Sequence, residues 1–180
     1  MSLYQLLRAD IDHLNSTYGK ENRKSIMMLF LIRKAVRLVV IFRILNYHYL
    51  KGNKFVLLLL LPLGLYYRIM ANRANIFISI KTKIGPGLKI NHLFGIVINS
   101  RVVIGSNCYI AHNVTIGSVS SSKIPRIGNN VTIFTGSIII GDVTIGDNVT
   151  VGAGSLVIKD IPADTVVVGN PCHILKQGIN

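Results

Sequence analysis

The chain has 180 residues, half of them hydrophobic, and carries 20 Lys and Arg against 7 Asp and Glu. This length suits one globular unit with an appended segment, and the hydrophobic share is sufficient for a substantial core. Most of the basic excess lies in residues 1–83, which hold 14 basic and 3 acidic residues, but no recognition motif accompanies it, so we do not expect nucleic acid as a partner.

The first residues and the two cysteines indicate where the protein is expected to reside and whether a thiol takes part in its chemistry. The first residues, MSLYQLLRAD, lack the basic region and apolar core of a secretory signal, which predicts a cytoplasmic protein. Cys108 and Cys172 lie too far apart in the sequence to form a metal-binding pair, and Cys108 is expected to be a small buried side chain. Neither cysteine therefore predicts a chemical role.

The segment 1–75 is predicted to be helical, basic and apolar. Residues 2–15 have the spacing of a first helix, residues 16–24 are polar and turn-like, and residues 25–50 form a long helical stretch interrupted by basic residues. Residues 55–67 are almost wholly apolar but too few to cross a bilayer, which takes about 20 residues. We expect this segment to pack on neighbouring subunits or to lie on the inner face of the cytoplasmic membrane, where basic charge favours anionic headgroups.

A repeat of six residues organises the chain from residue 84 onward, after an alternating stretch at 76–83 that predicts a first strand. The aliphatic residues at the repeat positions are Ile98, Ile104, Ile110, Ile116, Ile127, Ile133, Ile139, Ile145, Val151 and Val157. Neither the helical period of 3.6 nor the strand period of 2 explains this spacing, and hexapeptide repeats are typical of a parallel β-helix. Three units close one turn of the prism, so each anchor points inward and stacks on the anchor three units away.

The repeat breaks twice. Ile90 and Ile98 are eight residues apart, so two residues are inserted between them, and the gap of eleven between Ile116 and Ile127 predicts that residues 117–126 leave the wall as an extruded loop. Interruptions of a rigid scaffold often carry function. The β-helix is predicted to span 76–162, and residues 163–180 are expected to cap its open end.

Two histidines stand beside these breaks. His92 and His112 each occupy the third position of a unit, and their separation in the sequence equals one turn plus the insertion. The imidazoles should therefore lie together on one wall, at about the 4.8 Å spacing of strands, and the extruded loop is expected to converge on them. His13, His48 and His173 are interpreted as structural.

The runs KIGPGLKINHLFGIVINSRVVIGSN and VTIGDNVTVGAGSLVIKDIP, with GNPCHIL after them, carry a resemblance. They are similar to the hexapeptide-repeat acyltransferases, above all to serine acetyltransferases and the related O-acetyltransferases of surface-polysaccharide synthesis. The similarity covers roughly residues 76–176. It implies a mainly β fold, a left-handed parallel β-helix preceded by an N-terminal helical segment and closed by a short C-terminal cap.

The resemblance also implies an activity. Members of this family transfer acetyl from acetyl-CoA to a hydroxyl without a metal, in homotrimers whose sites lie between subunits. His92 falls on the family's catalytic histidine, and neutral imidazole is suited to take a proton from the attacking hydroxyl. His112 is expected to assist as acid, base or acceptor ligand, and the oxyanion is expected to meet backbone N–H groups near Gly117.

The family motif also predicts a coenzyme site. The pantetheine arm would lie in a groove beside Thr135, Gly136, Thr150, Ala153 and Gly154, where small side chains let the arm approach the backbone. Lys159 or Arg126 would meet the phosphates of the coenzyme.

Departures from the family bear on the acceptor, whose pocket is expected to include Asn91, Phe94 and Ile124. Asn91 replaces an Asp of the serine acetyltransferases, Phe77 replaces the Asp that orients the catalytic histidine, and Ile124 replaces a second histidine. These losses favour a sugar hydroxyl of surface-polysaccharide synthesis as acceptor. The alternative is a serine O-acetyltransferase of cysteine biosynthesis. A metal-dependent β-helix lyase, which needs three histidines, and a non-catalytic scaffold are less favoured.

Overall fold

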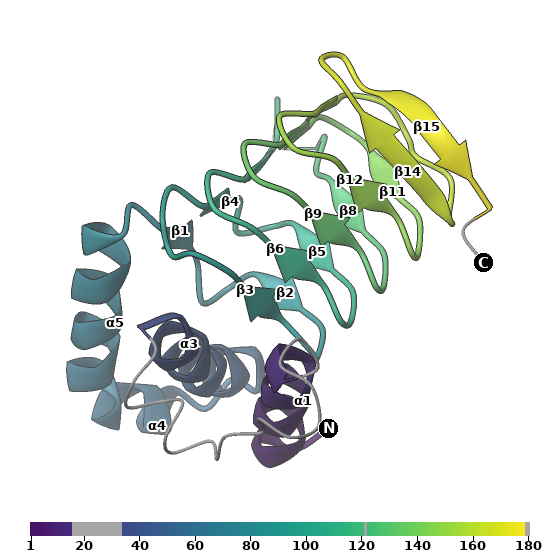
Figure 1. The fold of residues 1–180 in the computed structure, drawn as a ribbon. Helices are drawn as coiled ribbons and strands as arrows, with labels where there is room; N and C mark the ends of the chain where they lie inside the picture. Colours follow the sequence, from purple (N-terminus) through teal and green to yellow (C-terminus); the bar gives the residue numbers. More distant parts are fainter. Residues whose placement is uncertain (16–33, 121, 179–180) are drawn as a thin grey trace.

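The computed structural model describes residues 1–15, 34–120 and 122–178. Four helices of the described part precede the strands: α1 Leu3–Asn15, α3 Lys34–Leu50, α4 Lys54–Leu59 and α5 Leu61–Arg73. The helices gather at one end of a coiled β structure, and the C-terminal hairpin lies at the other (Figure 1). The predicted turn at 16–24 and the first part of the predicted helix at 25–50 lie outside the described residues.

The strands are short and their bounds follow the repeat. They are β1 Phe77–Ile78, β2 Lys83–Ile84, β3 Lys89–Ile90, β4 Val97–Ile98, β5 Val103–Ile104, β6 Tyr109–Ile110, β7 Thr115–Gly117, β8 Arg126–Ile127, β9 Thr132–Ile133, β10 Ile138–Ile140, β11 Thr144–Ile145, β12 Thr150–Val151, β13 Leu156–Val157, β14 Thr165–Val168 and β15 His173–Gln177.

Three sheets form the walls of a triangular prism. Sheet A contains β1, β4, β7, β10 and β13, sheet B contains β2, β5, β8 and β11, and sheet C contains β3, β6, β9, β12, β14 and β15. Every pairing is parallel except the antiparallel hairpin of β14 and β15, which closes the C-terminal end. The left-handed parallel β-helix with N-terminal helices is therefore confirmed as the fold.

The register confirms that three units of the repeat make one turn. Ile98 pairs with Ile116, and Ile133 pairs with Val151, each the anchor three units further along the chain. The insertion lengthens the turn in which Ile90 pairs with Ile110, and the extruded loop lengthens the turn in which Ile110 pairs with Ile133. Both breaks therefore alter the length of a turn and leave the stacks of anchors intact.

The core of the prism is built from the predicted inward positions. All ten anchors from Ile98 to Val157 are buried, with exposed fractions of at most 4%. The hydroxyls of Ser137 and Ser155, also inward, donate to the carbonyl of Gly152 at 2.9 and 2.7 Å, so their burial leaves no unpaired group. Cys108 is buried as predicted, and this burial raises the pKa of its thiol to about 11, which keeps it protonated and inert.

One prediction about element bounds is wrong. The stretch 76–83 forms two strands, β1 and β2, because residues 79–82 turn between them: the Thr82 N–H donates to the Ser79 carbonyl at 3.0 Å. The apolar stretch 55–67 is divided between α4 and α5, since Pro62 lies in the first turn of α5, where a missing N–H is tolerated.

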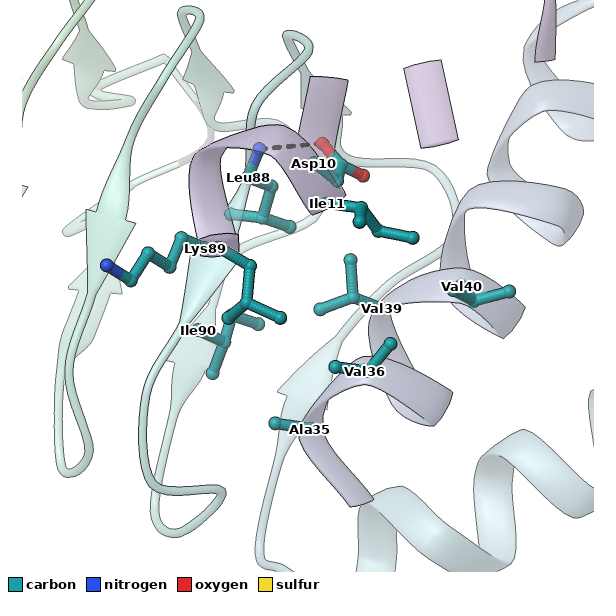
Figure 2. Close-up of a pocket in the computed structure, with 10 residues that line it drawn as sticks. Asp10, Ile11, Ala35, Val36, Val39, Val40, Leu88, Lys89 and Ile90 are labelled. Carbon is teal, nitrogen blue, oxygen red and sulfur yellow. Dashed lines mark hydrogen bonds between the residues drawn. The ribbon is translucent and has the colours of Figure 1, made fainter. Parts of the chain in front are cut away.

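The helices close the open end of the first β turn through polar contacts. The Arg43 guanidinium is fully buried and contacts both carboxylate oxygens of Asp10, with its Nε 2.6 Å from Oδ2. The same guanidinium donates to the Ile84 carbonyl at 2.7 Å. Figure 2 shows the Leu88 N–H, which donates to Asp10 Oδ1 at 2.7 Å. Arg43 and Asp10 thus tie α3 and α1 to the backbone of β2 and its following corner.

Two further side chains complete this closure. The Asn46 amide donates to the carbonyls of Ile80 and Thr82, at 2.7 and 2.9 Å, and the Tyr67 hydroxyl donates to the Ile78 carbonyl at 2.8 Å. The first turn of a solenoid has no preceding turn to donate hydrogen bonds to the carbonyls at its edge, so these helices take that place.

We expect Arg43→Met to lower the free energy of unfolding by about 3–5 kcal/mol, because it leaves the Asp10 carboxylate buried without its charged partner. Chemical denaturation followed by circular dichroism measures the change. Arg8→Met is the matched control, since the Arg8 and Asp12 side chains are 65% and 64% exposed and their pair at 3.7 Å should contribute little. Equal destabilisation of the two variants would contradict this account.

Candidate active site

His92 and His112 lie side by side on one edge of the prism. Lys89 pairs with Tyr109 and Ile90 with Ile110, so the register brings the two histidines beside each other where sheet C turns toward sheet A. Their ring centroids are 5.6 Å apart and the planes meet at 86°. The predicted proximity is confirmed, but the rings meet edge to face, an arrangement that aromatic pairs favour over a parallel stack.

Two corners of the prism hold the predicted site residues. The C–A corner comprises residues 91–96, 111–114, 134–137 and 152–155, and the A–B corner comprises residues 79–82, 99–102, 118–125, 141–143 and 158–160. Sheet A lies between them.

The two-residue insertion explains why His92 projects outward. His92 has φ 56° and Gly95 has φ 67°, and the Phe94 N–H donates to the His92 carbonyl at 2.9 Å, which closes a tight turn. A Cβ on Gly95 would lie 2.1 Å from Asn113 Oδ1, so this position requires glycine. His92 and Phe94 are exposed at this turn, which makes the imidazole accessible from solvent.

His112 is held more tightly. Its residue is half-buried, and within the described part of the chain its Nδ1 is buried without a hydrogen-bond partner. Unpaired buried polar atoms are uncommon in folded proteins and call for a functional explanation. Because this nitrogen is closed to solvent, a ligand at the C–A corner would meet another part of the half-buried His112 ring.

The β turns that carry the two histidines contain no Asp or Glu. The sequence has no Asp or Glu between Glu21 and Asp142. Asn91, which replaces the family's Asp, donates its amide to the Tyr109 hydroxyl at 3.1 Å. In the described residues, no group of three or more His, Cys, Asp and Glu side chains is placed to hold a metal ion.

A track of small residues continues from the histidines along the same corner. The Gly136 N–H donates to the His112 carbonyl at 3.3 Å, and the Gly154 N–H donates to the Thr135 carbonyl at 2.8 Å. Gly136, Ala153 and Gly154 are exposed, and a Cβ on Gly154 would meet nothing within 4 Å. The corner therefore leaves open space beside the backbone, as an extended thin ligand requires. Thr150 lies nearby on the outer face of sheet C, half-buried in β12.

The other predicted residues lie at or beside the A–B corner. Gly117 ends β7, Arg126 begins β8, and Ile124 and Lys159 lie in the corner itself. The loop borders a hollow of about 170 Å³ whose lining includes Arg101, Ser122, Ile124, Arg126 and Asp142.

The prediction that the loop converges on the two histidines is therefore wrong within one chain. His112 precedes β7 and the loop follows it, so a full wall of the prism separates them. The site residues form two sets, one at each edge of sheet A.

The sequence reasoning missed an aromatic cluster on sheet C. Tyr109 and Phe134 have ring centroids 6.0 Å apart, and the Lys89 ammonium lies 5.2 Å from the Tyr109 ring centroid. Each of these residues is adjacent to an inward anchor and must therefore point outward. Aromatic residues next to anchors could therefore have predicted this cluster from the sequence.

Comparisons with known proteins agree with this architecture. Residues 124–159 match the family model described as bacterial transferase hexapeptide (six repeats). The chloroplastic serine acetyltransferase 1 of Arabidopsis thaliana is 47% identical over 96 residues, which cover 52% of this chain and 31% of that protein.

Two solved structures are similar over nearly the whole chain. A soybean serine acetyltransferase complexed with serine is 30% identical, with a TM-score of 0.79, and the match covers 97% of this chain and 70% of that one. A serine acetyltransferase from Brucella abortus strain S19 in complex with coenzyme A is 26% identical, with a TM-score of 0.77, and the match covers 97% and 68%. By sequence, the matches span between 25% and 55% of the length of the first curated relatives.

Proposed function

This chain belongs to the hexapeptide-repeat acyltransferases with a left-handed β-helix, and we propose that it transfers an acetyl group from acetyl-CoA to an acceptor hydroxyl. The observation that carries the proposal is the pair of histidines at the open C–A corner, with rings 5.6 Å apart and small exposed residues next to them. This arrangement combines a base with room for a thioester.

His92 is the general base of the proposed reaction. Its neutral imidazole accepts the acceptor's hydroxyl proton as the hydroxyl oxygen bonds to the thioester carbonyl carbon. The tetrahedral intermediate then collapses, the carbon–sulfur bond breaks, and the departing thiolate takes the proton back from the imidazolium. Gly117 lies at the opposite edge of sheet A from His92, so backbone N–H groups near Gly117 of a neighbouring subunit are the proposed donors to the oxyanion.

His112 supports His92 in place of a carboxylate. The edge-to-face contact limits the orientations of the His92 ring, and no Asp or Glu lies within residues 22–141 to do so. The Nδ1 of His112 is buried, so any contact or proton exchange with the acceptor would involve the accessible part of this half-buried ring.

The pantetheine arm of acetyl-CoA fits the track of Thr135, Gly136, Ala153 and Gly154. The openness beside Gly154 supports this track. The Brucella serine acetyltransferase in complex with coenzyme A supports a coenzyme site in this fold. Thr150 would border the arm from sheet C. Lys159 and Arg126 are exposed cations at or beside the A–B corner, and one of them would meet the phosphates across a subunit boundary. We propose Lys159, because Arg126 lines the hollow of this corner.

A homotrimer would join the two sets of site residues. Sheet A separates them in one prism, and its outer face is apolar: Phe77, Val97 and Ile138 are 58%, 39% and 41% exposed. In a threefold ring the same contact repeats head to tail, so one edge of each prism can meet the other edge of the next. Full activity in a protein that light scattering shows to be monomeric would contradict this arrangement.

Serine is the acceptor that the comparisons favour, because the relatives are serine acetyltransferases and the soybean structure is complexed with serine. The hollow at the A–B corner supports it: Arg126 and Asp142 line the same space, and this pairing of charges suits the carboxylate and ammonium of an amino acid. Asn91, Phe94 and Ile124 would complete the acceptor pocket.

A sugar hydroxyl is the second candidate. Phe77, where the family has an Asp, is an exposed apolar side chain, and the Asn91 amide is engaged with Tyr109. Neither residue can supply negative charge to an acceptor's ammonium, which leaves an uncharged hydroxyl compound as the acceptor that suits the C–A corner by itself.

We expect His92→Ala to lower kcat for acetyl transfer by about 10²–10⁴-fold, the usual contribution of a positioned general base. Release of free thiol from acetyl-CoA measures the rate. His173→Ala, which removes an exposed histidine of β15, is the control and should retain activity. A His92→Ala enzyme with the unmodified rate would exclude the mechanism.

We expect Ala153→Phe to raise the KM for acetyl-CoA by roughly 10-fold or more, because the ring would fill the track without straining the backbone; a factor of 10 corresponds to about 1.4 kcal/mol. Ala163→Phe is the matched control, since Ala163 is also exposed but lies between sheets B and C. Initial rates over a range of acetyl-CoA concentrations test this. An unchanged KM in Ala153→Phe would place the arm elsewhere.

An acceptor screen decides between the two candidates. Thiol release is measured with serine and with a panel of hexoses, amino sugars and nucleotide sugars at equal concentrations. We expect serine to give the highest kcat/KM, and His92→Ala to abolish the response. A sugar that turns over while serine does not would replace serine with the second candidate.

A further inference from the structure

The outer side of α4 and α5 carries apolar residues that the described part of the chain leaves uncovered. The members of this α4–α5 face are Phe55, Leu58, Leu59, Leu61, Leu65 and Ile69, which are between 45% and 73% exposed. α5 stands on the outside of the helical layer, at the end of the molecule opposite the β14–β15 hairpin (Figure 1). The face is thus accessible in one chain, and burying it would not require the β-helix to move.

The fold itself does not need this face. Tyr67 and Ala71 on the inner side of α5 are buried against the core, and the Tyr67 hydroxyl bonds to the Ile78 carbonyl. Leu61, Leu65 and Ile69, four residues apart, form a stripe on the outer side, where a helix on a protein surface normally carries polar residues. A contiguous exposed apolar surface of this kind marks an interaction site.

An open groove adjoins the face. It has a volume of about 680 Å³ and runs between the helices and the first β turn, with Leu57, Leu60, Gly64 and Arg68 on its helical wall. Phe77 at its other wall belongs to the sheet A face proposed for the trimer, so the helical wall is the part left for a lipid. Its walls are largely apolar with a cation at the side, a combination that accommodates an acyl chain near an anionic headgroup.

The charge around the face selects the occupant. Residues 34–73 contain seven basic residues and no acidic residue. Four of these cations are exposed on α4, α5 and the turn before them: Lys51, Lys54, Arg68 and Arg73. Arg43 is buried in its ion pair with Asp10 and does not reach this surface. A second copy meeting this face by twofold rotation would bring cations against cations, and anionic headgroups would neutralise them.

We propose that the α4–α5 face docks on an anionic membrane surface, with its apolar side chains in the boundary between headgroups and acyl chains and its cations among the headgroups. Helices that lie in this boundary need an apolar side and flanking Lys or Arg rather than a membrane-spanning length. The described helices agree with such a position, since none is long and apolar enough to cross a bilayer. The inference does not depend on the transfer reaction.

Vesicle sedimentation with the full chain tests the proposal. The protein should sediment with vesicles of phosphatidylcholine and phosphatidylglycerol and not with phosphatidylcholine alone, and raising the salt concentration should release it. Leu58→Gln/Leu65→Gln/Ile69→Gln should lower the partition coefficient by roughly tenfold or more, because each substitution removes one apolar side chain that would be buried in the membrane. Leu175→Gln is the control, because Leu175 is 65% exposed in β15.

Charge variants test the second half of the proposal. Lys54→Gln/Arg68→Gln should weaken binding to the anionic vesicles by roughly tenfold or more. Lys123→Gln/Lys176→Gln removes two exposed cations far along the chain from this face and should bind as the unmodified protein does. Circular dichroism and thiol release establish that each variant is folded.

Three results would overturn the proposal. One is equal sedimentation with both kinds of vesicle, and another is retention of binding in the triple glutamine variant. The third is a lipid-free oligomer that dissociates in that variant, because a second copy of the chain would then cover the α4–α5 face.

Discussion

Everything in the β-helix depends on burying one aliphatic side chain in every six residues. Each anchor lies on the anchor of the next turn, as Ile98 does on Ile116, and the strands that carry the anchors are mostly two residues long. With the inward direction fixed at such short intervals, the residues on either side must point outward and fall into register with their counterparts. His92 and His112 lie together for this reason, although they belong to successive turns of the chain.

The constraint on the anchors also explains how a site can be inserted without loss of the fold. Two extra residues lengthen the turn after Ile90, but Ile90 still pairs with Ile110 and Ile98 still pairs with Ile116. The cost falls on the backbone between them, where His92 adopts a left-handed conformation that is sparsely populated for residues other than glycine. The same conformation recurs at Asn107, Asn130 and Asn148 in regular units, so His92 occupies a backbone position that other corners of the prism fill with Asn.

The repeat in the sequence was enough to predict the walls, the inward residues and the proximity of the histidines, because each follows from a fixed period. The same period places the strand of Ile116 between His112 and the loop, so the prediction that the loop reaches His112 was wrong by one wall of the prism. The turn at 79–82 was missed because an alternating pattern does not reveal a corner whose polar groups are satisfied by their own backbone. Asn91 and Tyr109 form a side-chain hydrogen bond that no period encodes.

The helical end of the molecule follows a different rule, set by hydrogen bonding and not by period. The first β turn presents carbonyls with no preceding turn to pair with them, and Arg43, Asn46 and Tyr67 donate to them from α3 and α5. Closure of the solenoid therefore uses only the inner sides of these helices. Polar residues on their outer sides would be compatible with this closure. Leu61, Leu65 and Ile69 occupy the outer side of α5 instead, uncovered within the described residues, and this is the surface that the proposed membrane contact would bury.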